Sequence, residues 1–285
     1  MAVNVNTNDL PEEGEGKARN KETKFIKAGN RVARCVQYVE LGKHHQMFKG
    51  KKAVYEQGKN AGRQKPPCLH VALTFEFPAE EYTGDYPLCI STSRRMDNGE
   101  FFDAITVPES LENGTMSLAY AMRTRFMKYL TALQAATGET YTNFADFARA
   151  KSPVMIKVTN KLGAKKEDGS QPTYANMKPE GIVKPCFEHP TSGEVIEVEV
   201  PEAIGEYPIP FEWDCPTEES WKGLQPWYKT AIKAAVDFAG SPIDMLLQSN
   251  PELDKVTEPA EDQDQTGNKP AEPEVDTTKQ EDIPV

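Results

Sequence analysis

The 285-residue chain contains few cysteines, and their positions do not indicate disulfide bonds. There are five, an odd number, widely spaced at Cys35, Cys68, Cys89, Cys186 and Cys215, without a Cys-x-x-Cys pair. Small secreted domains, in contrast, are stabilised by dense and paired cysteines. The sequence therefore argues against a disulfide framework.

Long hydrophobic runs are also missing. A membrane helix needs about 20 predominantly apolar residues, and no segment of this chain approaches that length. The N-terminal sequence MAVNVNTNDLPEEGEG has neither the basic start nor the apolar centre of a secretory signal. We therefore expect a soluble, cytoplasmic protein that makes no membrane contact.

Positive charge is in the minority, which at first argues against a nucleic-acid partner. The chain has 33 lysines and arginines against 44 acids, for a net charge of -11. The distribution is uneven, because residues 17–66 carry a net charge of +11 and residues 251–285 carry -8. Nucleic acid responds to the local field of a surface rather than to the total charge. The pattern therefore predicts a basic binding surface and a separate acidic tail.

The composition divides the chain into four parts. Residues 1–23 and the end of the chain have too few apolar residues to form a core, so we expect disorder there. The boundaries that we predict are a disordered arm over 1–23, a binding domain over 24–185, an extension ending in helices over 186–242, and a linker with a disordered acidic tail over 243–285.

Hydrophobic periodicity predicts a mainly β domain. Apolar residues alternate with polar ones in several short runs, and one run repeats at the three- to four-residue spacing of a helix. The predicted strands are 32–41, 68–77, 86–92, 154–162 and 173–183, with one helix over 117–137 and a short one over 144–150. Three strands, a helix and two strands follow the order of an OB-fold, a five-stranded Greek-key barrel with a helix between strands 3 and 4.

The first predicted strand has two unlike faces. Simple alternation places Ala33, Cys35, Val39 and Leu41 on one face and Arg34, Val36 and Tyr38 on the other. We therefore expect Arg34 and Tyr38 to point outward. The extension is predicted to be helical from a cap at Thr217, through Pro226 as the first residue of a second helix, to Phe238.

An OB-fold binds oligonucleotides on a strand face and on the loops between strands 1 and 2 and between strands 4 and 5. Both loops are rich in lysine here, over residues 43–67 and over residues 163–172 with Lys161 just before them. Lysines neutralise phosphates, and aromatic rings stack unpaired bases at about 1 to 3 kcal/mol each. Either loop alone is as well explained as solvated surface, but their coincidence at the two binding loops favours binding. The predicted DNA-binding residues are Arg34, Tyr38, Lys43, His44, Phe48, Lys49, Lys51, Lys52, Tyr55, Arg94, Arg95, Lys157, Lys161, Lys165, Lys166 and Tyr174.

Catalysis is poorly supported by the residue patterns. Cys68, His70 and Cys89 are potential zinc ligands, but no pair has ligand spacing. Five glutamates between Glu194 and Glu206 would suit a metal-dependent nuclease, yet alternation places most of them on one solvated strand face. We therefore expect no enzymatic activity, no metal and no cofactor.

Short motifs in the body resemble phage-encoded single-stranded DNA-binding proteins of the OB type. The resemblance covers about residues 25–240, with a longer link from Arg94 to Gly114 than in that family and with Tyr129 where its helix carries tryptophan. The motifs are Arg34-Cys35 before Glu40-Leu41-Gly42, Phe48-Lys49-Gly50, Thr74-Phe75-Glu76, the strand from Pro87 to Ser91, Glu212-Trp213-Asp214, Trp221 and Leu224-Gln225-Pro226-Trp227.

The last residues resemble the tail tip of bacterial single-stranded DNA-binding proteins, which ends Asp-Ile-Pro-Phe. This chain ends Asp282-Ile283-Pro284-Val285 after a long acidic segment. The resemblance implies that these four residues dock on replication and recombination enzymes, with less apolar area where valine replaces phenylalanine. A solubilising tail with a chance ending is the alternative.

Together the two resemblances imply a non-enzymatic coat for single-stranded DNA in phage replication, recombination and repair, acting in the cytoplasm of an infected bacterium. Two other classes stay open. One is a protein-interaction module, such as a strand-annealing mediator or a DNA mimic, whose basic loop is incidental. The other is a metal-dependent nuclease.

Overall fold

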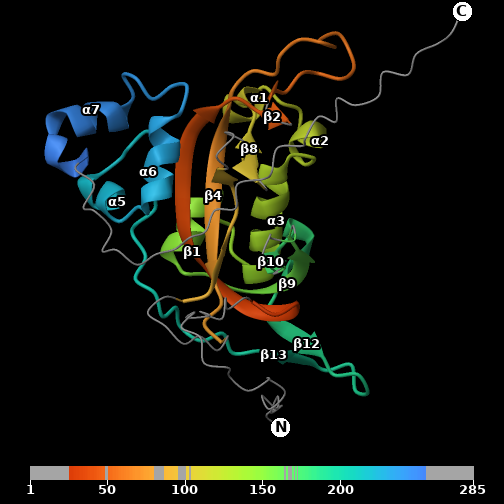
Figure 1. The fold of residues 1–285 in the computed structure, drawn as a ribbon. Helices are drawn as coiled ribbons and strands as arrows, with labels where there is room; N and C mark the ends of the chain where they lie inside the picture. The colour runs from red at the N-terminus through yellow and green to blue at the C-terminus, as the bar shows by residue number, and fades with distance from the viewer. Residues whose placement is uncertain are drawn as a thin grey trace, which may run out of the picture.

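The computed structural model describes residues 26–48, 51–79, 87–95, 101–102, 104–163, 165, 169, 171 and 173–254. The predicted N-terminal arm 1–23 and the predicted tail from residue 255 onward lie outside these residues. The described part is mainly β, with a curled antiparallel sheet in the form of a half-barrel and helices packed against it (Figure 1). This confirms the mainly β class that the periodicity predicts.

The central strand of the sheet is β1, Gly29–His44. Its first half pairs with β9 (Pro153–Leu162), from Gly29 opposite Val158 to Arg34 opposite Pro153. Its second half pairs with β4 (Cys68–Glu76), from Arg34 opposite Glu76 to His44 opposite Cys68. Because one strand changes partner along its length, the sheet curls instead of staying flat.

Shorter strands extend the sheet on both sides. Its order is β10-β9-β1-β4-β5, with β8 also on β4 and β11 also on β9, all antiparallel. Three two-stranded hairpins, β2-β3, β6-β7 and β12-β13, complete the β structure of the described residues. The remaining strands are β2 Met47–Phe48, β3 Lys51–Lys52, β5 Cys89–Ser91, β6 Arg94–Arg95, β7 Phe101–Phe102, β8 Ile105–Val107, β10 Thr173–Asn176, β11 Ile182–Val183, β12 Cys186–Glu188 and β13 Val195–Glu197.

The helices fall into two groups on opposite sides of the sheet (Figure 1). The first group precedes β9, and the second follows β13. The α-helices are α1 Glu109–Glu112, α2 Leu118–Ala121, α3 Arg125–Thr137, α4 Phe144–Arg149, α5 Glu218–Lys222, α6 Pro226–Lys233 and α7 Pro242–Ser249, with 3-10 turns η1 Pro179–Gly181 and η2 Pro251–Asp254.

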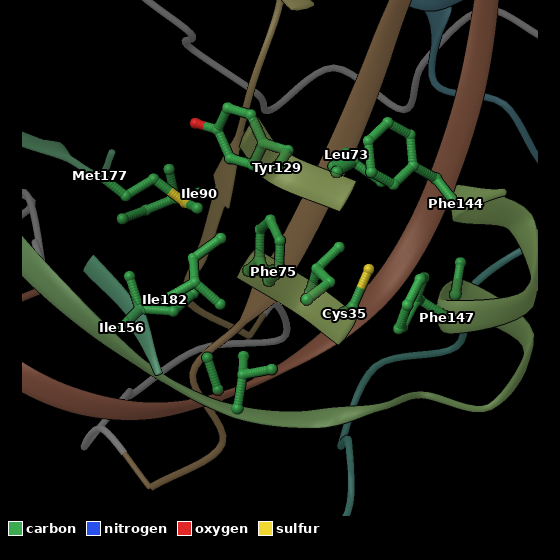
Figure 2. Close-up of a cluster of buried hydrophobic side chains, with 14 of the residues drawn as sticks. Cys35, Leu73, Phe75, Ile90, Tyr129, Phe144, Phe147, Ile156, Met177 and Ile182 are labelled. Atoms are coloured by element: carbon green, nitrogen blue, oxygen red, sulfur yellow. The ribbon is translucent and has the colours of Figure 1, made fainter. Parts of the chain in front are cut away.

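The concave face of the sheet buries the main core against α3 and α4 (Figure 2). Leu73 and Phe75 of β4 point inward, as the alternation of this strand predicts, and they meet Tyr129 of α3 and Phe144 and Phe147 of α4. All five side chains are fully buried. Each contributes about 1.5 to 3 kcal/mol through burial, so this face holds the half-barrel around its helix.

The convex face is buried as well. Val39 and Leu41 of β1 and Ala72 of β4 pack under a second cluster that includes Trp221 of α5 and Tyr228 of α6. The predicted extension therefore forms a second helical layer, on the side of the sheet opposite α3 (Figure 1). Strand β4 and the second half of β1 are consequently covered on both faces, whereas Gly29 and Asn30 at the start of β1 are exposed.

The predicted faces of β1 are wrong for its second half. Register shifts between Cys35 and Gln37 and between Glu40 and Gly42 mark β-bulges. A bulge adds one residue to one strand and so reverses the alternation beyond it. Tyr38 consequently joins Cys35 in the main core instead of pointing outward.

The predicted helix over 117–137 is divided in two. Thr124 is extended, and its hydroxyl accepts a hydrogen bond from the Met127 N–H at 3.2 Å, so Thr124 caps α3, which begins at Arg125 instead of at the predicted residue 117. The predicted end at Gly138 is confirmed, since this glycine has a φ of 76°. The predicted strand 173–183 is also divided, because η1 separates β10 from β11.

The folded body extends past the predicted boundary at residue 242. Pro242 opens α7 as its first residue after the Ser241 cap, where proline is favourable, although the sequence alone suggested a break. Ile243 is buried in the second cluster, and the Trp221 indole donates to the Leu253 carbonyl at 3.1 Å. Residues 243–254 are therefore structured, and α6 ends at Lys233 instead of Phe238.

A glycine in β1 allows the C-terminal layer to approach the sheet. Gly42 has a φ of 80°, and a Cβ there would lie 2.4 Å from the Trp213 ring and 2.6 Å from Ala235. We expect Gly42→Ala to lower the free energy of unfolding by about 3 kcal/mol, because left-handed strain adds to overpacking. Chemical denaturation followed by tryptophan fluorescence measures this loss.

Gly138→Ala is the matched control. Its φ of 76° is nearly the same, but nothing lies within 4 Å of the added Cβ. It should therefore lose only about 1 kcal/mol from the backbone strain. Equal losses in the two variants would show that the Trp213 contact contributes nothing.

Candidate nucleic-acid interface

The clearest basic feature is the arm, which we define as residues 43–67, from the last two residues of β1 to the start of β4; residues 49 and 50 lie outside the described part. It extends beyond the upper end of the sheet (Figure 1). Hairpin β2-β3 pairs Phe48 with Lys51, and the rest is held by backbone bonds such as Tyr55 N–H to the Arg63 carbonyl at 2.9 Å. The segment that the sequence predicts as a loop thus contains one short two-stranded pairing.

The arm presents rings and cations together. Phe48 is 63% exposed, and its register partner Lys51 and neighbouring Lys52 are also exposed. Farther along, the Lys65 ammonium lies 5.9 Å from the centre of the half-buried Tyr55 ring. Cations next to flat apolar rings suit a ligand that has both phosphates and unpaired bases.

The base of the arm is tied to the body. Lys43 lies 3.4 Å from the Glu112 carboxylate of α1, and its backbone N–H donates to Asp237 at 2.8 Å. The Lys43 side chain is only partly exposed. It therefore positions the arm and offers less free charge than Lys51 or Lys52.

His44 is buried, so its predicted role in binding DNA is wrong. Its ring packs beside His70 and Phe101, with ring centres 5.4 and 4.8 Å away, and its Nε2 donates to the Leu41 carbonyl at 2.9 Å. His70 is only 2% exposed, and neither ring nitrogen has a hydrogen-bond partner. Burial, and then the neighbouring His44, lower the pKa of His70 to about 3.

Arg34 is also engaged inside the protein. Its guanidinium donates to the carbonyls of Lys151, Val200 and Pro201 at 3.0, 2.9 and 2.6 Å, and it pairs with Glu202 at 2.8 Å. These bonds fasten the chain after β13 to the half-barrel. The prediction that Arg34 contacts DNA is wrong, because its donors are used by the backbone.

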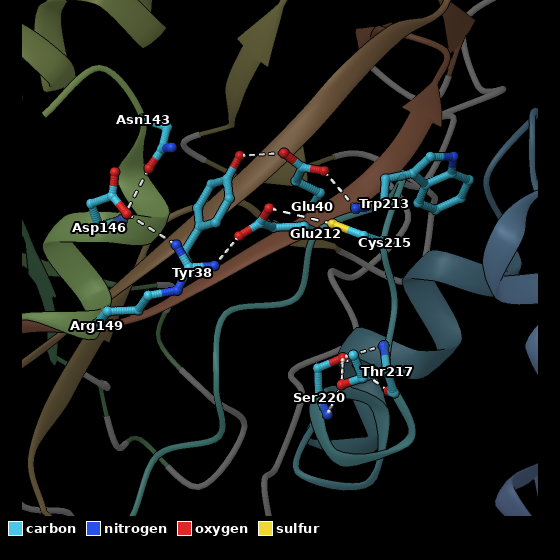
Figure 3. A network of polar contacts seen from close by, with 10 residues as sticks. All are labelled: Tyr38, Glu40, Asn143, Asp146, Arg149, Glu212, Trp213, Cys215, Thr217 and Ser220. Atoms are coloured by element: carbon cyan, nitrogen blue, oxygen red, sulfur yellow. Dashed lines mark hydrogen bonds and ion pairs between the residues drawn. The ribbon is translucent and has the colours of Figure 1, made fainter.

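Tyr38 belongs to a polar network between the half-barrel and the C-terminal segment (Figure 3). Its side chain is 5% exposed, and its hydroxyl donates to Glu40 at 2.7 Å. The other oxygen of Glu40 accepts from the Trp213 N–H at 2.6 Å. Burial raises the pKa of Glu40, although both hydrogen bonds act in the opposite direction. Tyr38 therefore cannot stack a base, and the prediction for it is wrong.

Two further contacts complete this attachment. Arg149 of α4 forms ion pairs with Asp146 and with Glu212 of the C-terminal segment (Figure 3). At the end of β4, the fully buried Glu76 accepts hydrogen bonds from the backbone N–H groups of Ile204 and Gly205 and from the Tyr207 hydroxyl. Sequence reasoning missed these roles, because Glu212 and the partners of Glu76 lie more than 60 residues away in the chain and no local spacing indicates them.

The second predicted group is at the β9-β10 hairpin. Lys161 and Tyr174 are register partners there, and both are exposed, as are Lys157 on β9 and Lys165 after it. Figure 1 shows β10 beside the lower part of α3, whereas the arm extends above the upper end of the sheet. The two groups are thus separate surfaces in this view.

The remaining predicted residues are described only in part. Arg94 and Arg95 form β6, paired with Phe102 and Phe101, but their side chains lie outside the described part of the chain. Lys49 and Lys166 also lie outside it, as do Asp282, Ile283, Pro284 and Val285.

The buried His70 predicts a pH dependence of stability. Its folded pKa of about 3 lies below the ordinary value of 6.5, so its contribution is fully present above pH 6.5 and is lost as the pH falls toward 3. Between pH 7.5 and pH 5, the wild type should lose about 2 kcal/mol more than His70→Leu, because only the unfolded wild type gains this proton. Urea unfolding at both pH values measures the difference.

His189→Gln is the matched control, because His189 lies exposed in a turn. Its loss of unfolding free energy between pH 7.5 and pH 5 should equal that of the wild type. If His70→Leu also loses as much as the wild type, protonation of His70 is not linked to unfolding.

Comparisons of the chain with protein-family models, with curated proteins and with solved structures found no match. Within the described residues, no cluster of three or more histidine, cysteine, aspartate or glutamate side chains is arranged to hold a metal ion. No described helix has the length and apolar character of a membrane span.

Proposed function

We propose that this protein binds single-stranded DNA with little sequence preference. The observation that carries the proposal is the arm, where an exposed phenylalanine stands next to exposed lysines on a segment raised above the body. Lysines displace counterions from phosphates, and rings stack bases of any sequence. Such binding involves no chemical step, so the proposed protein is not an enzyme.

The proposed architecture is an OB-fold. The pairings β1 with β4, β4 with β5, β1 with β9, and β9 with β10 follow the strand connections of that barrel, and α3 precedes β9. In this assignment the arm is the loop between strands 1 and 2, and residues 163–172 are the loop between strands 4 and 5. These are the loops that contribute to ligand binding in OB-folds.

The helical layer restricts the proposed interface to the loops. On the convex face, the Tyr228 hydroxyl of α6 lies 2.8 Å from Ser91 and 3.2 Å from Thr74. The hydroxyls of Thr74 on β4 and Ser91 on β5 are therefore occupied by the protein. The arm and the β9-β10 hairpin remain exposed to phosphates and bases. This supports a path for the DNA strand along the edges of the half-barrel.

The acidic tail is proposed to recruit partner proteins. The segment 251–285 carries a net charge of -8 and the segment 17–66 carries +11, within one chain. A tethered polyanion competes for the basic arm when DNA is absent and becomes available to replication or recombination enzymes when DNA is bound. This is the role that we propose for the protein in an infected bacterial cell, in phage replication, recombination and repair.

Charge removal on the arm tests the DNA site. We expect Lys51→Ala with Lys52→Ala to weaken binding to a poly-dT strand and to reduce the slope of log affinity against log salt by about 1.4, because each phosphate contact contributes about 0.7. Fluorescence anisotropy at several salt concentrations measures both quantities. Lys222→Ala with Lys233→Ala, on the C-terminal helical layer, is the matched control.

The control pair should keep the wild-type slope. An unchanged slope in the arm variant would remove these two lysines from the interface. Failure of the wild-type protein to bind the strand at all would overturn the proposed function.

Deletion of residues 255–285 tests the tail, since the body is structured to Asp254. At low salt the truncated protein should bind poly-dT more tightly, because a competing polyanion is gone. It should also lose the replication enzymes that the full chain retains from an extract of infected cells. Unchanged DNA affinity together with unchanged retention would contradict both proposed roles of the tail.

A further inference from the structure

Helix α2 carries a group of exposed apolar side chains to which the proposed interface assigns no role. Leu118, Tyr120 and Met122 are all exposed, with Tyr120 at 65%. The Arg123 guanidinium lies 5.5 Å from the centre of the Tyr120 ring. We call these four residues the ledge.

The ledge is held in place by its backbone. Ala121 is buried beneath it, and the Thr124 hydroxyl donates to the Ala121 carbonyl at 2.6 Å. The Met116 N–H donates to the Ser110 carbonyl at 2.6 Å, which ties the segment before α2 to α1. The ring is thus exposed on an anchored turn, where little ordering is needed before a flat ligand stacks on it.

The surroundings of the ledge favour a polyanion. No aspartate or glutamate occurs in the sequence between Glu112 and Glu139, whereas Arg123, Arg125 and Lys128 fall within this stretch. Lys128 lies 4.0 Å from Glu180 and the Arg125 guanidinium lies over the Tyr129 ring, so Arg123 is the cation that the ledge presents. The ledge also lies at the same end of the molecule as the arm (Figure 1), where Lys43 at the base of the arm is paired with Glu112 of α1. A strand leaving the arm therefore meets positive charge and an exposed ring.

We infer that the ledge is a second contact for the same single strand, with Tyr120 stacking an unpaired base and Arg123 binding the neighbouring phosphate. This inference rests on the proposed function and extends it, because it assigns a path from the arm onto α2. A pair of ring and guanidinium suits an unpaired strand better than a duplex, whose bases are already stacked.

The test uses dT strands of increasing length with the full chain. Tyr120→Ala should weaken binding to long strands at least about fivefold, and it should leave the shortest strands that bind nearly unaffected, since these occupy the arm alone. Tyr120→Phe keeps the ring and should retain wild-type affinity. A long strand carrying 5-iodouracil should crosslink to Tyr120 on irradiation, as mapped by peptide mass spectrometry.

Phe187→Ala is the matched control. Phe187 on β12 is also half-exposed, at 50%, but it stands beside Glu188. It should bind strands of every length as the wild type does. Thermal unfolding of all three variants should match the wild type, because both rings are exposed.

The failures are distinguishable. Wild-type affinity of Tyr120→Ala for long strands, in a protein that does bind them, would overturn the ledge and leave the arm as the site. A dimer that Tyr120→Ala dissociates without changing DNA affinity would assign the ledge to a second copy instead. Absence of any binding by the wild type would overturn the ledge together with the proposed function.

Discussion

The fold depends on one long strand that pairs with two different neighbours. The first half of β1 is bonded to β9 and its second half to β4, and two bulges bend the half that pairs with β4. The bend curls the sheet around α3, and the reversed alternation turns Tyr38 into the main core while Val39 and Leu41 face the C-terminal helices. Both hydrophobic clusters therefore depend on the geometry of this single strand.

The two-sided burial of the sheet determines where a ligand can bind. A sheet with one open face exposes side chains that can contact a partner. Here both faces of β4 and of the second half of β1 are covered, so their side chains cannot do so. Arg34, Glu40 and Glu76 use their charges to fasten the C-terminal segment across the sheet. Buried charges of this kind are stable only when fully hydrogen-bonded. Within the described residues, the arm, the β9-β10 hairpin and the ledge each combine exposed cations with exposed rings.

Local patterns predicted much of the fold. The alternation of β4, the helix end at Gly138, the short helix α4, the cap at Thr217 and the helix start at Pro226 depend on neighbours within a few residues, and they agree with the structure. The features that the sequence failed to predict have a common cause. The bulges in β1, the break before Thr124 and the helix after Pro242 depend on partners distant in sequence, which no periodicity contains.

The candidate site, too, has features that the sequence predicts and features that depend on the fold. The sequence by itself determined that the chain has a basic segment, an acidic end and a mainly β body, because charge and periodicity are properties of neighbouring residues. Only the tertiary structure decided which charged and aromatic side chains are available. Arg34, Tyr38 and His44 are basic or aromatic like Lys51 and Phe48, but they are enclosed by segments up to 168 residues away. Availability to a ligand is a property of packing, so it follows from the fold and not from residue type.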